Sequence, residues 1–141
     1  MRIVFLAAAL ALATSIGFAQ TKPTRNVWDG VYTAAQADRG DKLFAASCAM
    51  CHGANMSGGG GVPGLIGPEL LVIWGNKPAY GLFDTIQATM PADAPGSLRP
   101  QQYADILSAI FKANGFPTSP DKELPAERAA LEDILVSQNK P

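Results

Sequence analysis

Apolar side chains recur at intervals of three and four residues through most of the chain after residue 32, which is the spacing that one face of an α-helix requires. The pattern predicts helices that begin at Thr33, Pro68, Pro78 and Pro100, and a last amphipathic stretch that follows Pro125. No segment alternates convincingly between apolar and polar residues as a half-buried strand would. The sequence therefore predicts a small all-α domain of about four to five helices.

The first predicted helix begins with Thr33-x-x-Gln36, the form of a capping box in which each side chain satisfies a free backbone N–H group. Positions three and four residues apart share a helix face, and one such stripe should bring two thiols to the same side. The stripe consists of Ala37, Gly40, Phe44, Cys48 and Cys51. Glycine in a helix interior costs roughly 1 kcal/mol relative to alanine, so we expect another helix to approach closely at Gly40.

The later helices carry clear apolar faces and end signals. Pro68 opens a short helix that Gly75 closes, and Pro78 opens a longer one that ends at Pro91. The helix from Pro100 has a left-handed cap at Asn114-Gly115. The residues expected to face inward are Leu82, Phe83, Ile86 and Met90, then Tyr103, Ile106, Leu107, Ile110 and Phe111, and finally Leu131, Ile134 and Leu135.

The first nineteen residues have the form of an export signal: Arg2, an apolar run from Ile3 to Ala13, and the small-x-small pattern of Gly17-Phe18-Ala19. The apolar run is short for the ~20 residues that span a bilayer, so we expect cleavage rather than a retained anchor. No other segment is apolar enough to cross a membrane. The expected organisation is a signal peptide at 1–19, a loose lead-in at 20–32, one domain at 33–116 and an extension with a short helix at 117–141.

The charge balance narrows the class of partner. Without Arg2, the exported part would carry ten of the eleven Lys and Arg residues against twelve Asp and Glu, a formal charge of about −2. It contains no basic run suited to nucleic acid. We therefore expect no nucleic-acid partner, and we expect the protein to act outside the cytoplasm, in the periplasm.

The stretch Cys48-Ala49-Met50-Cys51-His52 is the C-x-x-C-H pattern that attaches a c-type haem. Two thiols at this spacing can form thioethers with the two vinyl groups of one porphyrin edge, and the next residue carries an imidazole to the iron. The motif uses both cysteines and the only histidine of the chain. It predicts one covalently bound haem c, with His52 as an axial ligand.

Three other readings of the motif are weaker. A thioredoxin-like C-x-x-C pair should sit beside a βαβ pattern, and none is visible. A structural zinc site needs four Cys or His ligands, whereas the chain offers three. A structural disulfide in an exported protein would close a very short loop and leave His52 without a role.

Iron held by His52 needs a ligand on its other side, and thioether sulfur is a known partner of histidine in cytochromes. Met50 lies between the anchoring thiols and is poorly placed. Met56 follows His52 by four residues, which is too near to pass comfortably around the ring edge. Met90 lies thirty-eight residues downstream, enough chain for this path at ~3.3 Å per extended residue. Met90 is the predicted second ligand, with Met56 as the fallback and a core position as the alternative role of Met90.

The loop after His52 is rich in glycine and proline. The glycine run at 58–61 has no Gly-Lys-Ser/Thr after it and no strand before it, so we expect a flexible loop over one porphyrin face rather than a phosphate-binding loop. Within Pro63-x-Leu65, a backbone carbonyl could accept the second ring N–H of His52. Leu65 and Trp74 are expected to line the haem. Trp74 either donates its indole N–H to a propionate or is a core residue.

From about Tyr32 to Phe116 the chain resembles a class I c-type cytochrome, of the small monohaem kind associated with exported quinone-cofactor dehydrogenases and terminal oxidases. The matching features are Gly40-x-x-x-Phe44, Cys48-x-x-Cys51-His52, Pro63-x-Leu65, Thr89-Met90-Pro91 and Tyr103-Ala104-Asp105-Ile106-Leu107. The chain departs from the family in having Gly64 where related sequences often carry a second proline. The tail from Thr118 adds little to the match.

The resemblance implies covalent attachment of the haem through Cys48 and Cys51. It implies His52 as the proximal ligand and Met90 as the distal one, and a first helix that crosses the helix bearing Tyr103. The expected fold is a cytochrome c-like domain wrapped around one haem.

With both axial positions filled, substrate has no open coordination site, so the expected activity is electron transfer rather than catalysis. We expect a carrier that passes one electron between a dehydrogenase and a respiratory acceptor, as a monomer or as a subunit of a larger redox complex. Two alternatives stay open. One is a haem enzyme or gas-binding protein in which Met90 is labile, and the other is a thiol-redox or structural module without haem.

Overall fold

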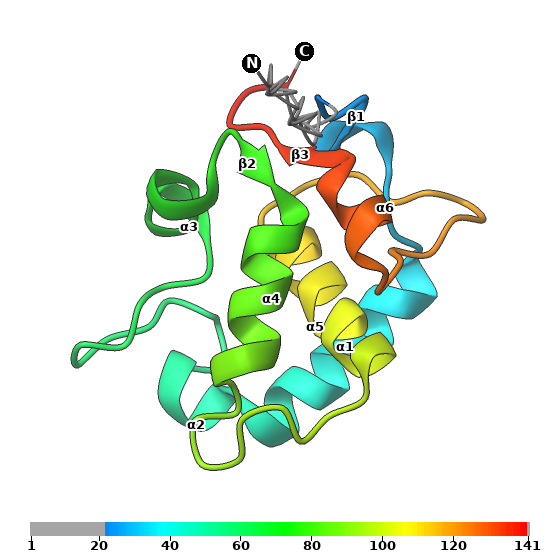
Figure 1. The fold of residues 1–141 in the computed structure, drawn as a ribbon. Coiled ribbons are helices and arrows are strands. Elements are labelled where there is room, and N and C mark those ends of the chain that lie inside the picture. Colours follow the sequence, from blue (N-terminus) through cyan, green and yellow to red (C-terminus); the bar gives the residue numbers. More distant parts are fainter. Residues whose placement is uncertain (1–21, 141) are drawn as a thin grey trace, which may run out of the picture.

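The computed structural model describes residues 22–140, and the signal peptide expected at 1–19 lies outside that range. Six helices dominate the described chain, so the prediction of a mostly helical fold is confirmed. None of the helices within 22–140 is long and apolar enough to cross a bilayer. The elements in chain order are β1 (Arg25–Asn26), a 3-10 turn η1 (Val27–Asp29), α1 (Ala34–Ser47), α2 (Ala49–His52), α3 (Gly67–Trp74), β2 (Lys77–Pro78), α4 (Ala79–Thr89), α5 (Pro100–Ala113), α6 (Arg128–Glu132) and β3 (Ile134–Val136) (Figure 1).

Within residues 22–140, α1 and α5 make the most extensive contact between two helices. A Cβ atom added to Gly40 would overlap the carbonyl oxygen of Asp105 and lie 3.0 Å from the Cβ of Ala109. Only glycine allows the two backbones to approach this closely. The helix approach predicted at Gly40 is confirmed, and Phe44, one turn further on, is buried beside it.

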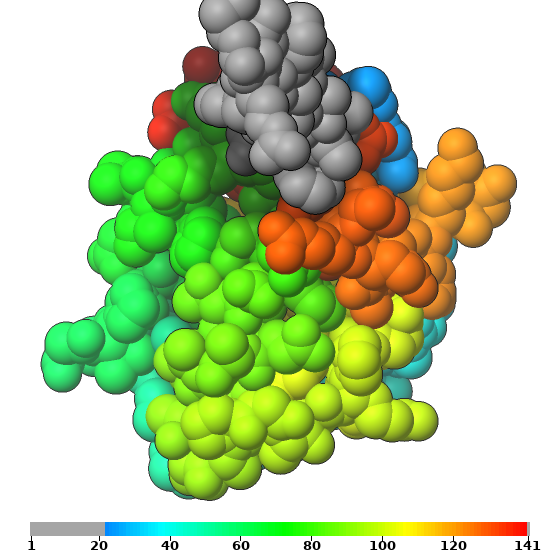
Figure 2. All heavy atoms as spheres, in the orientation of Figure 1, coloured from blue at the N-terminus to red at the C-terminus, as the bar shows by residue number. Residues whose placement is uncertain are grey.

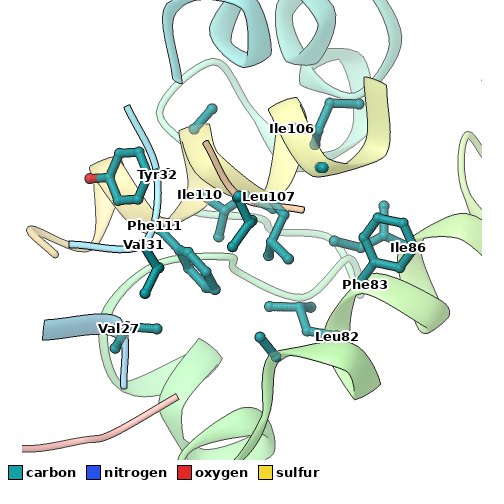
Figure 3. Close-up of a cluster of buried hydrophobic side chains, with 14 of the residues drawn as sticks. Val27, Val31, Tyr32, Leu82, Phe83, Ile86, Ile106, Leu107, Ile110 and Phe111 are labelled. Atoms are coloured by element: carbon teal, nitrogen blue, oxygen red, sulfur yellow. The ribbon is translucent and has the colours of Figure 1, made fainter. Parts of the chain in front are cut away.

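The main hydrophobic core lies between α4, α5 and the segment that precedes α1 (Figure 3). The inner faces predicted for α4 and α5 are confirmed by side chains that are at most 9 % exposed. They are Leu82, Phe83 and Ile86 of α4, and Tyr103, Ile106, Leu107, Ile110 and Phe111 of α5. The spacing of these residues fits one face of each helix, which is why periodicity alone identified them.

The segment before α1 is not the loose lead-in that its composition predicted. Val27 and Val31 are fully buried, and the buried hydroxyl of Tyr32 donates to the carbonyl oxygen of Phe116. Trp28 packs edge-on against Phe116 with ring centroids 5.0 Å apart. The prediction was wrong because this segment is irregular, and its buried residues therefore follow no helical or strand period.

Only one of the two hydrogen bonds of the predicted capping box is present at the start of α1. The Thr33 hydroxyl accepts a hydrogen bond from the backbone N–H of Gln36 at 3.1 Å. The Gln36 side chain does not return to Thr33. Its amide nitrogen donates to the carbonyl oxygen of Leu124 at 2.9 Å, and its amide oxygen accepts from the Leu124 N–H at 2.6 Å. The fully buried Gln36 thus satisfies the backbone N–H and carbonyl of Leu124. Leu124 is also fully buried, so these groups have no access to water.

The two cysteines do not lie on one continuous helix. α1 ends at Ser47, and Cys48, with φ −128° and ψ −33°, separates it from the single turn of α2. Within that turn the N–H groups of Cys51 and His52 both donate to the Cys48 carbonyl oxygen, at 3.1 and 3.0 Å. The predicted stripe is therefore buried only as far as Phe44, and it continues into a separate turn that carries the motif.

The boundaries expected for α3, α4 and α5 are confirmed within one residue. Gly75 caps α3, and Met90 is the first residue after α4. Asn114 caps α5, and Gly115 follows in the left-handed conformation with φ 76°. Proline and glycine act through local backbone geometry, so their positions needed no tertiary information.

A small three-stranded sheet was not predicted. β3 pairs in parallel with β1 and antiparallel with β2, in the order β1-β3-β2. The last amphipathic stretch is therefore part helix and part strand: Leu131 is buried in α6, and Ile134 in β3, while Leu135 is half-buried. Strands of two or three residues are too short to show alternation, and their partners lie far apart in the sequence.

Replacing Gly40 by alanine should destabilise the domain by about 1–3 kcal/mol, because the new methyl group overlaps the α5 backbone. Helix propensity alone predicts the opposite sign, a gain of about 1 kcal/mol. Urea unfolding of the haem-loaded protein measures the difference. Ala45→Gly on the exposed side of α1 is the control and should cost about 1 kcal/mol. A stabilised Gly40→Ala variant would refute the close crossing.

Candidate functional site

His52 ends the single turn of α2, and its side chain is only 6 % exposed. Its Nδ1 atom lies 3.0 Å from the carbonyl oxygen of Pro63, the contact that the Pro63-x-Leu65 turn predicted. A carbonyl oxygen can only accept, so Nδ1 carries the proton and Nε2 keeps a free lone pair. No hydrogen bond to Nε2 is present within residues 22–140. The ring is therefore oriented as a metal-binding imidazole should be.

The backbone that presents the Pro63 carbonyl is held by two side chains. The carboxylate of Glu69 in α3 accepts from the Gly64 N–H at 2.7 Å. The Asn114 amide donates to the Leu65 carbonyl oxygen at 2.9 Å and accepts from the Gly67 N–H at 2.8 Å. Together they fix the turn from α3 on one side and from the end of α5 on the other.

Sequence reasoning missed Glu69 and Asn114 as site residues. Asn114 was expected only as part of a helix cap, and its partners lie 47 and 49 residues away. Glu69 explains the departure at position 64. A proline there would lack the N–H that Glu69 accepts, and a Cβ atom would collide with the Glu69 carboxylate. An acidic residue five positions after glycine is a weak signal that gains meaning only once the turn is known.

The two cysteines are free thiols in unlike surroundings: Cys48 is half-buried and Cys51 is exposed. Burial raises the pKa of the Cys48 thiol above its ordinary value, and the negative charge of a neighbouring Cys51 thiolate acts in the same direction. A catalytic redox pair needs a cysteine whose pKa is lowered. Cys48 therefore lacks the lowered pKa of such a cysteine.

Met90 and the loop that follows it are anchored by a tyrosine of α5. The hydroxyl of Tyr103 donates to the Met90 carbonyl oxygen at 2.8 Å and accepts from the Leu98 N–H at 3.3 Å. Tyr103 is 1 % exposed and packs edge-on against Phe83 with centroids 6.5 Å apart. One rigid side chain thus fixes both ends of the loop from Met90 to Leu98. Met90 itself is half-buried against the core.

The other methionines are placed differently. Met50 is 98 % exposed. Met56 is 6 % exposed, adopts a left-handed backbone with φ 61°, and lines a shallow cavity beside Ala109 and Lys112 of α5. The sulfur-bearing side chain of Met56 is thus already packed against the α1–α5 side of the domain.

Leu65 and Trp74, both predicted to line a haem, are half-buried at the edge of the core. Trp74 ends α3 and packs across Gly81 of α4, where an added Cβ atom would lie 3.2 Å from the indole ring. The ammonium of Lys77 lies 5.7 Å from the centre of the same ring. The indole N–H makes no hydrogen bond to another residue within 22–140, and the ring packs against the edge of the core.

The residues present fit a covalently bound haem. They supply two free thiols at C-x-x-C spacing, a buried imidazole with Nε2 free, and a half-buried thioether on an anchored loop. Imidazole nitrogen and thioether sulfur are the donor types that c-type cytochromes use. Phe44 supports the imidazole from α1, with ring centroids 6.5 Å apart.

The family described as "Cytochrome C oxidase, cbb3-type, subunit III" matches residues 35–108, just over half of the chain. The chain belongs to this family of c-type cytochrome domains. Comparisons with curated proteins and with solved structures found no match. The matched range runs from the first turn of α1 into α5, so it includes the haem-attachment motif, the Pro63 turn and Met90.

Family membership establishes the coarse function. A cytochrome c domain carries covalently bound haem c and transfers electrons. This confirms the resemblance to a class I c-type cytochrome and agrees with a role in electron transfer, either alone or within an oxidase complex.

Tyr103→Phe should lower the free energy of unfolding by about 1–2 kcal/mol, because the partly buried Met90 carbonyl and Leu98 N–H lose their partner. Amide hydrogen exchange at Leu98 should accelerate. The matched control is Tyr80→Phe, whose hydroxyl donates to Asp84 at the surface and whose loss should cost below about 0.5 kcal/mol. Equal effects of the two variants would show that Tyr103 does not anchor the loop.

Proposed function

We propose that this protein is an exported, periplasmic one-electron carrier with one haem c, ligated by His52 and Met90, which works between a dehydrogenase and a respiratory acceptor. The observation that carries the proposal is the buried His52 ring. Its Nδ1 is bound to Pro63, its Nε2 is free, and it directly follows two free thiols. That combination has a clear use in holding haem iron and none in a thiol-redox protein.

Haem c bound in this way supplies a one-electron Fe(III)/Fe(II) couple. The protein's part is to hold the donors still, so that little rearrangement accompanies electron transfer. The Pro63 carbonyl fixes the tautomer and plane of His52, so that Nε2 is the nitrogen offered to the iron. Glu69 and Asn114 keep that carbonyl in place. Tyr103 performs the corresponding task for the Met90 loop.

Two observations support Met90 over Met56 as the second ligand. Both backbone polar groups of Met56 are bonded within the loop, its N–H to the Gly53 carbonyl at 3.0 Å and its carbonyl to the Leu65 N–H at 2.8 Å. Its side chain packs toward α5. Met90 instead stands directly after α4, on the loop whose two ends are bonded to Tyr103.

Export is supported by the signal pattern at 1–19 and by the two cysteines, which must reach the haem-attachment machinery as thiols. The respiratory partner is supported by the family description, which names an oxidase subunit. A subunit role in a dehydrogenase complex uses the same residues in the same way.

The exported, processed protein should be heavier than its polypeptide by roughly six hundred daltons, the order of one haem. The Cys51→Ser variant, with one anchoring thiol, should retain haem less well. Mass spectrometry and the visible spectrum of the periplasmic fraction provide the measurement. Unmodified polypeptide in that fraction would exclude a haem carrier and favour the structural alternative.

Met90→Ala should abolish the weak sulfur-to-iron absorption band at the near-infrared edge of the oxidised protein while the haem stays attached, because only the thioether donor is lost. Met56→Ala is the matched control and should leave the band in place. The opposite result would transfer the ligand assignment to Met56. Reduced wild-type protein should bind carbon monoxide slowly or not at all at neutral pH. Rapid binding would favour the enzyme or gas-binding alternative.

A further inference from the structure

One peptide unit of the loop after His52 is hydrogen-bonded on both sides. The Pro63 carbonyl oxygen lies 3.0 Å from Nδ1 of His52 and accepts its proton. The Gly64 N–H donates to the Glu69 carboxylate at 2.7 Å. These two backbone groups belong to the same peptide bond, which is trans, so they point in opposite directions. We call this chain of two hydrogen bonds, from the carboxylate to the imidazole ring, the Glu69–His52 link.

The carboxylate end of the Glu69–His52 link brings a negative charge to the turn. Glu69 is the only Asp, Glu, Lys or Arg residue of the sequence between Lys42 and Lys77. Within residues 22–140, no Lys or Arg side chain forms an ion pair with it. It stands in the first turn of α3, where the helix dipole favours a negative group. Its bond to the Gly64 N–H is therefore of the charge-assisted kind, which is roughly twice as strong as a bond between neutral groups.

The residue at position 64 makes the link possible. A proline there would have no N–H to donate to the carboxylate. Any other side chain would place a Cβ atom against the carboxylate oxygen of Glu69. A chain with proline at this position cannot form the link, so the link depends on Gly64 as much as on Glu69.

Glu69 lies at the surface, whereas the groups that it binds are covered. Figure 2 shows α3 and the loop before it at the left edge of the molecule, next to solvent. The Glu69 side chain is exposed, while Gly64 is buried and His52 is only 6 % exposed. Salt screens the field that an exposed charge sends through solvent, but it does not screen polarisation that passes along bonds. The two routes therefore have different experimental signatures.

We propose that Glu69 lowers the reduction potential of the haem iron by acting on His52 through the peptide bond between Pro63 and Gly64. An anionic acceptor on the N–H side of a conjugated amide increases the negative charge on its carbonyl oxygen. The Pro63 oxygen then accepts the Nδ1 proton more strongly, and the ring becomes a stronger electron donor at Nε2. A stronger donor favours Fe(III) over Fe(II). Glu69 is thus a positioning residue that acts on the ligand without touching the metal. The inference rests on the proposed function, because it requires His52 to bind haem iron.

Glu69→Gln tests the proposal, because it removes the charge and keeps an amide oxygen that can accept the Gly64 N–H. In a redox titration against a one-electron mediator, the equilibrium should shift about threefold toward the reduced protein, a rise in potential of about 30 mV at ~59 mV per tenfold. The NMR resonance of the His52 Nδ1 proton in the reduced protein should move upfield, because its hydrogen bond weakens. A variant with unchanged potential and resonance would show that Glu69 only holds the turn in place.

The matched control is Glu127→Gln, which removes an exposed carboxylate at the start of α6 whose side chain caps no backbone group. It should leave both the mediator equilibrium and the Nδ1 proton resonance at their wild-type values. A raised potential in Glu69→Gln with an unmoved resonance would overturn the link and leave only a field through space. Absence of haem in the wild-type protein would instead overturn the proposed function, and the visible spectrum distinguishes that outcome.

A double-mutant cycle separates the link from the field of the charge. Gly64→Pro removes the N–H, so Glu69→Gln should change the mediator equilibrium by less than about 1.5-fold in that background. Equal effects of Glu69→Gln in both backgrounds would refute the link. If Gly64→Pro takes up no haem, salt decides the question. The effect of Glu69→Gln should be the same at about 0.05 M and about 0.5 M salt, and its loss at high salt would overturn the proposal.

Discussion

The backbone contact between α1 and α5 at Gly40 is the constraint on which the rest of the structure depends. It lets α1 lie directly against Asp105 and Ala109, with Phe44 buried one turn further on. Because α1 leads straight into the turn that carries the cysteines, this contact also sets where the haem-attachment motif begins. Phe44 continues the connection by supporting the ring of His52.

The tail completes the domain rather than extending beyond it. Its Leu124 backbone is bonded by the buried Gln36 of α1, and β3 joins β1 to the short strand between α3 and α4. Val136 also accepts the N–H of Asn76, and Gln138 donates to the Leu71 carbonyl. These bonds tie α3 to the body of the domain, and α3 supplies Glu69 for the turn beside His52.

The residues expected to bind the haem iron are thus held in place by residues that lie well away from them in the sequence. Each of the two residues expected to bind the iron has a contact that limits its movement: Pro63 for His52, and Tyr103 for the Met90 loop. Rigid placement suits electron transfer, because donors that do not move add little to the cost of changing the iron charge.

The sequence by itself determined the features that depend on neighbours in the chain. The C-x-x-C-H motif, the proline and glycine boundaries of α3, α4 and α5, and the apolar faces of α4 and α5 all follow from local geometry and period. Only the tertiary structure decided the break at Cys48, the burial of Val27 and Val31, the small sheet, and the Gln36, Glu69 and Asn114 contacts. The physical reason is that these features need partners many residues away, or backbone positions without a regular period, and neither leaves a repeating pattern along the chain.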